Sequence, residues 1–503
     1  MRQRSSGDVH GDADIGAVAA RKVVLPLALA QFIASYAGTN MNVAISTIAE
    51  SLDTTVVGMQ TTITLFTLTM ASLMIPGSKL SDIWGRKVCF IAGLTIYGTG
   101  AFLALLAQGL GLMVVGYSLL EGVGSALMIP PIYILITVLF SDIRSRAKYF
   151  GVVSGAAGLG AAAGPLIGGL LTSAISWRAS FLAQVLVVGW IIFLARKIVD
   201  PPRQTPAPQF DLLGAALSAG GLFFVVLGFL QSSKYGWFSS STDLVVGDTV
   251  VLPAGGVSPV WISVAVGALF LTGFFWHSRS RERRRRDPLV PTRLFRNRVS
   301  NLGLTTQLIQ WLILQGSFFV ISVFLQQVRQ FNAIETGLML TPATIGILAA
   351  AAAAERLAGR RSQRWLIRSG FVVTSLGMAL VLALAREDSS VFSFVPGLLL
   401  MGIGIGVMLT SSVNVVQSAF PDTDQGDISG VSRSFSNLGS SLGTALAGSV
   451  LVAASVPGGK PFALALGTLL VISLIGLGAA MLLPPDRKTT PRAGEAPAPS
   501  GSG

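Results

Sequence analysis

A single glutamate inside a long apolar segment is the residue with the most evident chemistry. Glu121 is the only acidic residue near the middle of any apolar run, and it lies about halfway along 111–134. A carboxyl group in a low-dielectric surrounding is expected to bind and release a proton near neutral pH. Tyr117 and Ser118 lie four and three residues earlier, on the same helix face. Glu121 is therefore the candidate for proton coupling, and the alternative is a permanently protonated glutamate in a structural hydrogen bond.

Amide and aromatic side chains within apolar runs are the candidates for a binding cavity. Amides are costly in lipid, so each is expected either to line a cavity or to hydrogen-bond a neighbouring helix. The cavity candidates are Asn40, Asn42, Tyr117, Ser118, Gln307, Gln310, Trp311 and Asn414. Both histidines lie outside the apolar runs, Cys89 is the only cysteine, and the runs hold no nucleophile–base pair. We therefore expect no catalytic residue, no metal and no cofactor.

The elements that carry these residues are membrane-spanning helices. Charged residues make up only 12% of the 503 residues, against about 25% in a soluble protein, and 51% are hydrophobic. A soluble protein with so few charges could not cover its surface. The apolar runs lie near 23–45, 55–77, 88–108, 111–134, 150–173, 180–196, 212–231, 259–276, 302–326, 337–354, 367–385, 391–415, 428–454 and 462–483. These fourteen runs predict an all-α membrane protein with little room for a soluble domain.

The basic residues predict the orientation of these helices. Of the 36 basic residues, one set of connections holds only Arg178, Lys234, Arg329, Arg386 and Lys460. The other set and both termini are expected to be cytoplasmic, in a plasma-membrane protein. The basic segment 279–287 is expected to contact anionic lipid, and no nucleic-acid partner is expected.

A short connection after the second run has the composition of a turn with a basic pair. It reads GSKLSDIWGRKV at 77–88. Leu80, Asp82, Gly85, Arg86 and Lys87 match the loop of the major facilitator superfamily, G-x-L-x-D-x-x-G-R-K, with Ser78 in place of its first glycine. This resemblance implies a cytoplasmic gating loop that latches two halves of a transporter. The alternative is a surface turn that sets topology.

The fifth run carries regularly spaced glycines and one proline. They are Gly151, Gly160, Gly164, Pro165, Gly168 and Gly169. Small residues at every fourth position let another helix backbone approach closely, so ordinary packing is one explanation. The spacing also resembles the antiporter motif of superfamily exporters, G-x8-G-x3-G-P-x2-G-G, which implies export.

The whole chain resembles the 14-span drug:proton antiporter-2 family within that superfamily. Further matches are FDLLG at 210–214, DPLVPTRLFRNR at 287–298 and FLQQV at 324–328. The resemblance implies a major facilitator fold, in which two six-helix bundles flank two inserted helices. The expected divisions are a tail at 1–22, bundles at 23–197 and 301–483, inserted helices at 198–300, and a disordered cytoplasmic tail at 484–503.

The sequence departs from this family where the family's coupling residues lie. Ala37 occupies the position of an aspartate in the first helix, Ser118 that of an arginine, and Ser436 that of another arginine, with Arg433 one turn earlier. Arg433 is expected to pair with a lipid headgroup or with the acidic loop around Asp424. The favoured function is a monomeric exporter of a small amphipathic compound, drug-like or metabolite, by proton antiport. The alternatives are a lipid or amphipathic-metabolite transporter without this coupling and, more remotely, a transporter-like sensor.

Overall fold

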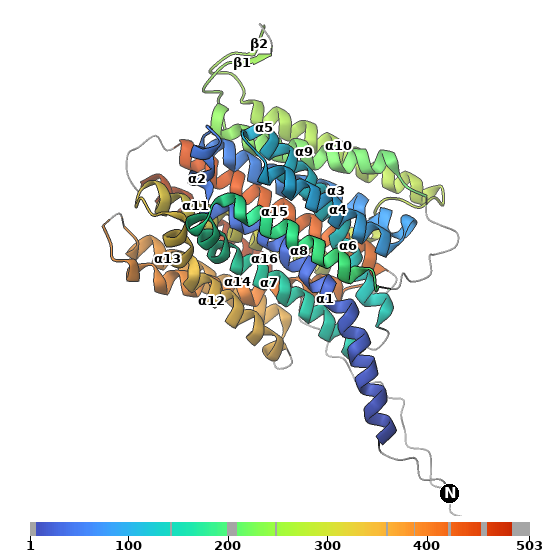
Figure 1. The fold of residues 1–503 in the computed structure, drawn as a ribbon. Coiled ribbons are helices and arrows are strands. Elements are labelled where there is room, and N and C mark those ends of the chain that lie inside the picture. The colour runs from blue at the N-terminus through green and yellow to red at the C-terminus, as the bar shows by residue number, and fades with distance from the viewer. Residues whose placement is uncertain are drawn as a thin grey trace, which may run out of the picture.

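The computed structural model describes most of the chain as a bundle of long helices (Figure 1). The described residues are 7–140, 143–198, 209–246, 249–358, 361–386, 388–420, 424–453 and 460–484. Of the predicted disordered tail at 484–503, all but residue 484 lies outside them. Helix α1 begins at Gly7, so most of the segment assigned to an N-terminal tail continues the first helix.

The order of elements follows the apolar runs closely. In chain order they are α1 (Gly7–Val43), α2 (Ile45–Ser51), α3 (Val56–Trp84), α4 (Arg86–Leu105), α5 (Leu110–Met113), the π-helix η1 (Val114–Glu121), α6 (Gly122–Leu139), α7 (Ile143–Ala174), α8 (Trp177–Ala195), α9 (Leu212–Tyr235), β1 (Leu244–Val246), β2 (Thr249–Leu252), α10 (Pro259–Arg283), the 3-10 helix η2 (Thr292–Arg296), α11 (Arg298–Gln327), α12 (Ala333–Ala358), α13 (Gln363–Leu384), the 3-10 helix η3 (Val391–Ser393), α14 (Val395–Gln417), α15 (Gln425–Ala453) and α16 (Lys460–Met481). The antiparallel pair β1–β2 lies in the long connection between α9 and α10.

Among the described residues, 13 helices are long and apolar enough to cross a membrane. This differs by one from the fourteen apolar runs. The helix outside this set is α15, which occupies the place of the thirteenth run and is 29 residues long. Serine and glycine are frequent along α15, and it packs between α11 and α3 rather than facing lipid. A helix enclosed by other helices can span a membrane with a more polar sequence than one that faces lipid.

The helices pack in two groups of six. In the first group α1 packs on α7, and α4 packs on α6 and α8; in the second, α14 packs on α12 and α13, and α11 on α15 and α16. The most extensive contacts between the groups are those of α3 with α15 and of α7 with α12. The inserted helices α9 and α10 pack on each other, and α9 also contacts α3 and α15 (Figure 1).

Local chemistry explains several helix boundaries. The Thr55 side chain accepts a 3.1 Å hydrogen bond from the Gly58 amide and thereby caps the start of α3. Gly85 separates α3 from α4 with φ of 105°, a conformation that only glycine adopts without strain. Pro165 lies within α7, where it removes one backbone hydrogen bond.

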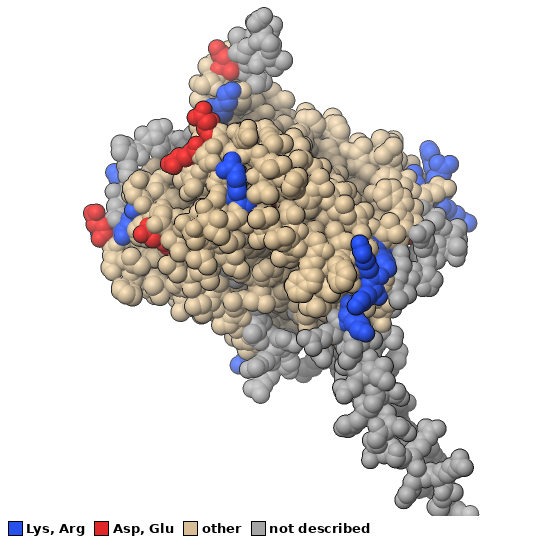
Figure 2. Space-filling model, in the orientation of Figure 1, with Lys and Arg blue, Asp and Glu red and all other residues tan. Residues whose placement is uncertain are grey.

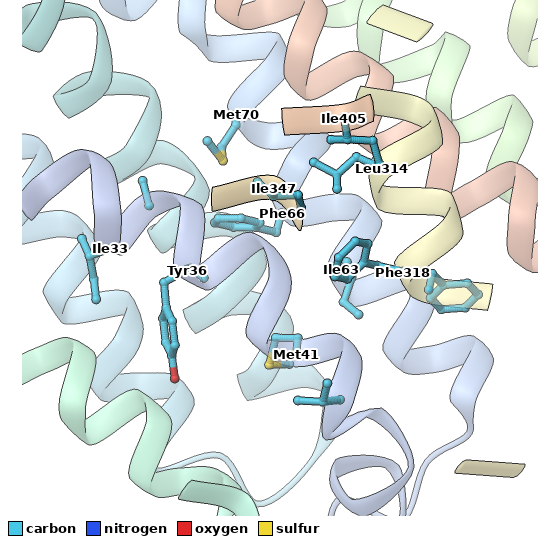
Figure 3. Packing of buried hydrophobic residues seen from close by; sticks show 14 of the residues in the cluster. Ile33, Tyr36, Met41, Ile63, Phe66, Met70, Leu314, Phe318, Ile347 and Ile405 are labelled. Atoms are coloured by element: carbon cyan, nitrogen blue, oxygen red, sulfur yellow. The ribbon is translucent and has the colours of Figure 1, made fainter. Parts of the chain in front are cut away.

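Apolar side chains cover much of the exposed surface of the bundle and also fill its interior. Figure 2 shows a broad face that is mostly uncharged, and most of its charged side chains lie towards the margins. Large apolar side chains are exposed, such as Leu186, Trp190, Phe193 and Leu269. Continuous exposure of this kind fits contact with lipid tails. Inside, Tyr36, Phe66 and Phe318 belong to one hydrophobic core that extends across both groups of helices (Figure 3).

Candidate functional site

A small cavity lies between the two groups of helices. Its volume is about 40 Å³, room for very few water molecules. The described residues that line it are Gln31, Ala34, Ser35, Gly38, Thr39, Phe66, Thr67, Met70, Ile129, Trp311, Gln315, Arg433, Ser436, Asn437 and Ser440. These residues come from α1, α3, α6, α11 and α15. A drug-sized ligand needs about 300 Å³ or more, so in this structure the cavity is too small to hold one.

Hydrogen bonds between the two groups seal the cavity in the direction of α2. The Gln326 side chain of α11 accepts from the Ser46 amide at 3.1 Å and donates to the Asn42 carbonyl at 3.0 Å. Gln315 donates to the Gly38 carbonyl at 2.5 Å. The amide of Ile334 also donates to the Ser173 hydroxyl at 2.8 Å, between α12 and α7. This end is the predicted extracellular end.

Contacts between α3 and α15 join the two groups along one wall of the cavity. The Ser434 hydroxyl donates to the Ala71 carbonyl at 2.6 Å, and Thr67 and Ser441 share a 2.7 Å hydrogen bond. A Cβ atom at Gly430 would lie 3.0 Å from the Ser78 Cβ, so the two backbones approach closely there. The hydrogen bonds near α2 therefore hold the two groups together at the predicted extracellular end, and the α3–α15 contacts hold them together alongside the cavity.

Glu121 lies inside the first group of helices, at the end of the π-helix η1, and does not line the cavity. Its side chain is fully buried, and neither carboxyl oxygen accepts a hydrogen bond of good geometry from a described residue, although the Tyr97 hydroxyl lies nearby. Tyr97 and Tyr117 are its electrostatic neighbours. The Tyr97 hydroxyl is directed to Gln184 of α8. Isolated π-helical turns often mark functional positions, and this one places a buried carboxyl group behind the cavity wall.

Two neighbours of Glu121 tie η1 to the cavity-lining helices. The Tyr117 hydroxyl donates a 2.9 Å hydrogen bond to the Ala37 carbonyl in α1, and its ring stacks on Phe66 with centroids 4.6 Å apart. The Ser118 hydroxyl donates to the Thr62 carbonyl in α3 at 2.7 Å. Glu121 is thus connected to the cavity through Tyr117 and Phe66.

The amides of α1 differ in their surroundings. Asn40 lies against Gly168 of α7, and its Oδ1 atom has no hydrogen-bond partner in the described part of the chain. Asn42 is fully buried, and neither polar atom of its side chain has a partner among the described residues. A buried amide without a hydrogen-bond partner costs free energy. Two such amides therefore destabilise this stretch of α1 in the present conformation.

The other cavity candidates are distributed over the second group. Trp311 lines the cavity. Gln307 is buried, donates to the Ser436 hydroxyl at 2.7 Å and accepts from Ser432 at 2.9 Å, so it joins α11 to α15. Gln310 shares a 2.8 Å hydrogen bond with Ser412 of α14, and Asn414 is exposed. In this structure Trp311 is the one sequence-derived cavity candidate among the described residues that line the cavity.

The glycine-rich α7 packs closely on both groups. A Cβ atom at Gly160 would clash with the Phe32 backbone, and one at Gly164 with the Thr39 side chain, both in α1. Towards α12, Gly169 of α7 lies against the Ala333 carbonyl, and Gly337 of α12 lies against the Pro165 carbonyl. Helix α7, which also contains Gly151, therefore contacts α1 within its own group and α12 of the other group.

The predicted gating loop joins α3 to α4 at the predicted cytoplasmic end. Asp82 and Arg86 are 3.6 Å apart, and the Lys87 ammonium donates to the Arg196 carbonyl at 2.9 Å. Leu80 and Asp82 lie in the last turns of α3, and Gly85 forms the break between helices. Across the interface Asp427, near the start of α15, interacts electrostatically with Lys79 and Asp82. The loop therefore faces charges of the other group.

Asp427 has an unusual protonation equilibrium. Burial raises its pKa to about 6, with Asp82 and Asp424 adding to the rise while Lys79 and Arg293 oppose it. Asp424 itself is paired with Arg293 at 2.7 Å. An acidic group at this interface changes charge within the physiological pH range.

Arg433 lies where the sequence did not place it. Its guanidinium stacks over the Tyr133 ring of α6, 4.6 Å from the centroid, and lines the cavity. The expected pairing with the acidic loop is not seen, because Asp424 pairs with Arg293 instead. The part of that loop at 421–423 lies outside the described residues. The helix periodicity of α15 could have indicated this orientation, because Arg433, Ser436 and Ser440 are three and four residues apart.

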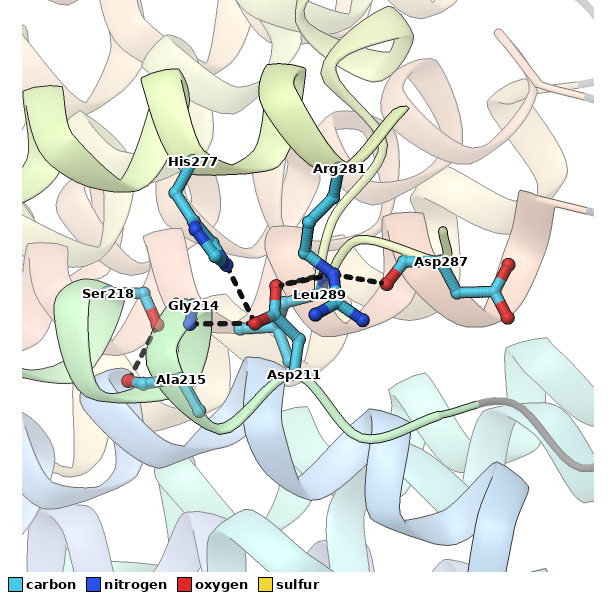
Figure 4. Close-up of polar contacts among 8 residues, drawn as sticks. All are labelled: Asp211, Gly214, Ala215, Ser218, His277, Arg281, Asp287 and Leu289. Atoms are coloured by element: carbon cyan, nitrogen blue, oxygen red, sulfur yellow. Dashed lines mark hydrogen bonds and ion pairs between the residues drawn. The ribbon is translucent and has the colours of Figure 1, made fainter. Parts of the chain in front are cut away.

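A second polar cluster, which sequence reasoning missed, holds the inserted helices (Figure 4). Asp211 caps α9 by accepting from the Gly214 amide at 3.0 Å. It also contacts His277 Nε2 at 2.9 Å, Arg281 Nε at 3.5 Å and the Leu289 amide at 3.3 Å. Burial raises the pKa of Asp211, but the Gly214 hydrogen bond, His277 and Arg281 together hold it below its usual value. The capping position of Asp211 in FDLLG is the sequence signal for this cluster.

A larger cavity of about 530 Å³ lies within the second group, between α11, α13 and α16. Its lining includes Phe324, Phe394 and Phe462 together with Arg386 and Lys460. It lies at the predicted extracellular end and is not enclosed between the groups. The central cavity is the better candidate for cargo, because only there do both groups contribute walls.

Two six-helix groups around a central cavity, with apolar outer surfaces, define a multi-pass membrane transporter. The model of the Major Facilitator Superfamily matches residues 27–444, with a second match at 313–501, and the chain belongs to this superfamily. The all-helical membrane fold and the exporter type within the superfamily are confirmed.

Named relatives are resistance and export proteins. The chain is 28% identical over 429 residues to the puromycin resistance protein pur8 of Streptomyces alboniger, covering 85% of this chain and 80% of the relative. It is 27% identical over 413 residues to the multidrug resistance protein Stp of Mycobacterium tuberculosis (82% and 72%), and 26% over 472 residues to the lincomycin resistance protein of Streptomyces lincolnensis (92% and 91%). These relatives indicate a plasma-membrane transporter of small compounds rather than an enzyme.

A solved structure supports the fold. The human organic anion transporter MFSD10 (TETRAN) superposes with a TM-score of 0.60 at 15% sequence identity, covering 92% of this chain and 99% of the other. At this identity the likeness concerns the fold alone.

Proposed function

We propose that this chain exports a small amphipathic compound, drug-like or metabolite, by alternating access driven by inward proton flow. The observation that carries the proposal is the central cavity, which both groups of helices line and which hydrogen bonds close at the predicted extracellular end. A cavity of this kind opens to one side at a time when one group rocks against the other. The relatives named for resistance and export support the outward direction.

In the proposed transporter the two bundles are formed by residues 23–197 and 301–483. The inserted helices lie within 198–300, and both termini lie in the cytoplasm. The closely packed α7 is the element on which the rocking turns, because it contacts both α1 and α12. The gating loop with Leu80, Asp82, Gly85, Arg86 and Lys87 latches the cytoplasmic end, where Asp427 faces Lys79 and Asp82.

Glu121 is the proposed coupling acid. Its side chain is fully buried beside Tyr97 and Tyr117, next to the wall of the cavity. Opening of the cavity towards one side would admit water through the Tyr117 and Phe66 wall and allow the proton to leave. Ala37 and Ser118, which replace ionisable residues of the family pattern, leave Glu121 as the acidic residue nearest this wall.

The alternative function is transport of a lipid or an amphipathic metabolite without proton coupling. The neutral Ala37 favours it, because a transporter of cationic drugs benefits from a fixed acid in the first helix. A transporter-like sensor is the remote alternative.

Transport by the purified protein in liposomes tests the proposal. A fluorescent amphipathic dye should move against its gradient when a pH gradient is imposed, and nigericin, which dissipates that gradient, should stop the movement. Downhill movement that is unaffected by the pH gradient would favour the alternative without coupling.

A further inference from the structure

The most unusual charge in the molecule is a cation that lines the central cavity. Arg433 belongs to α15, and its guanidinium stacks over Tyr133 of α6, which belongs to the other group of helices. Among the described residues no carboxylate forms an ion pair with it. An arginine that is partly buried in a membrane protein without an anionic partner carries a substantial desolvation cost.

The walls of the cavity do not compensate this charge. None of the described lining residues is acidic. The polar lining residues Gln315 and Ser436 already donate to Gly38 and Ser432, respectively. Stacking on Tyr133 recovers only part of the desolvation cost, because a cation–π contact is weaker than a buried ion pair. The cavity therefore has a net positive charge.

We propose that the central cavity takes amphipathic organic anions, and that Arg433 is the counter-charge for their carboxylate or sulfonate group. A guanidinium offers several N–H donors that match the two or three oxygens of such a group. The apolar wall of Phe66, Met70, Ile129 and Trp311 suits the rest of such a molecule. When cargo enters, its anionic group takes the place of the Tyr133 ring as the partner of Arg433.

This inference rests on the proposed export function, yet it concerns binding alone and can fail separately. It names the chemical class of the cargo, which proton coupling does not determine. Glu121 does not oppose it, because that side chain lies behind the wall formed by Tyr117 and Phe66 rather than in the cavity.

Two dyes that differ by a single sulfonate provide the test. 1-Anilinonaphthalene-8-sulfonate is an amphipathic anion, and N-phenyl-1-naphthylamine is its neutral counterpart. Their fluorescence is measured on the full chain in nanodiscs, without any gradient, after subtraction of protein-free nanodiscs. Arg433→Gln should weaken binding of the sulfonate dye about tenfold or more and change binding of the neutral dye less than about twofold. Arg433→Lys should retain part of the preference for the anion.

The matched control is Arg361→Gln, which removes an arginine stacked on Trp365 at an exposed position outside the cavity. It should bind both dyes as the unmodified protein does. Equal loss of both dyes in Arg433→Gln, or no loss of the sulfonate dye, would overturn the inference. If the unmodified protein binds the anion in an Arg433-dependent way but shows no gradient-driven export, the proposed function is contradicted and the present inference is not.

A second measurement does not depend on the folding of an Arg433 variant. Ser440→Cys on a Cys89→Ser background places one thiol in the cavity wall. Anionic ethylsulfonate and cationic ethyltrimethylammonium methanethiosulfonates are compared there, with Ser239→Cys at an exposed loop position as the reference. Relative to that reference, the anionic reagent should be favoured severalfold at position 440. An equal or opposite preference would contradict the inference.

Discussion

The hydroxyl of Tyr117 donates a 2.9 Å hydrogen bond to the carbonyl oxygen of Ala37. This contact joins the π-helix that ends at Glu121 to the position of α1 where the family pattern has an aspartate. The structure thus connects the substituted position to the buried glutamate through one side chain. A displacement of α1 during the transport cycle would act directly on the surroundings of Glu121.

The close packing of α7 on α1 predicts a strong effect of side-chain size. Gly164→Leu should leave the protein in the membrane but abolish transport, because even a Cβ atom there clashes with Thr39. Dye export from liposomes measures the effect. Gly155→Leu is the control in the same helix, because a Cβ atom there would meet nothing within 4 Å. Export by Gly164→Leu at the unmodified rate would show that the motif has no role in movement.

The Asp211 cluster predicts a loss of stability. Asp211→Ala removes the cap of α9 and the carboxylate that faces His277 and Arg281, which should cost about 2–4 kcal/mol of unfolding free energy. Thermal unfolding in detergent, followed by tryptophan fluorescence, measures this. Asp243→Ala, which removes one hydrogen bond at an exposed position, should have a much smaller effect. Equal effects of the two variants would show that the cluster adds nothing to stability.

The fold was largely predictable, and the site was predictable only in part. Apolar runs and the basic-residue bias depend on the surrounding lipid, so they indicate where helices lie. Helix α15 is less apolar than the other long helices, because a helix enclosed by other helices does not need an apolar surface. Helix periodicity indicates the face of α15 on which Arg433 lies. Its stacking on Tyr133 and the position of Glu121 behind Tyr117 depend on how distant helices rotate and pack, which no local pattern determines.

The raised pKa of Asp427 predicts a pH-dependent stability. Folding favours the neutral form of the Asp427 carboxyl group, so its protonation stabilises the folded protein. This stabilisation is complete below the ordinary pKa of 3.8 and is lost as the pH rises through about 6. Asp427→Asn stays neutral at every pH, so its melting temperature should exceed that of the unmodified protein by a few degrees at pH 8 and by less at pH 5. Differential scanning fluorimetry measures both. Asp53→Asn, at an exposed position, serves as control, and a pH-independent difference for Asp427→Asn would contradict the prediction.

The orientation is tested by two single cysteines on a Cys89→Ser background. Ser239→Cys lies in the connection between α9 and α10, and Arg284→Cys directly follows α10; both positions are exposed. In intact cells an impermeant maleimide should label position 239 and not position 284, whereas opened membranes should allow both. Labelling of both in intact cells would contradict the predicted topology.

The central claim is that Glu121 couples proton flow to export, and gradient-driven transport by Glu121→Gln tests it most directly. Glutamine keeps the size of the side chain but cannot ionise. In liposomes with an imposed pH gradient, the unmodified protein should concentrate the dye, and Glu121→Gln should lose this uphill transport by about 100-fold or more while downhill exchange of labelled for unlabelled dye persists. Uphill transport by Glu121→Gln at the unmodified rate would contradict the account and make Glu121 a structural residue.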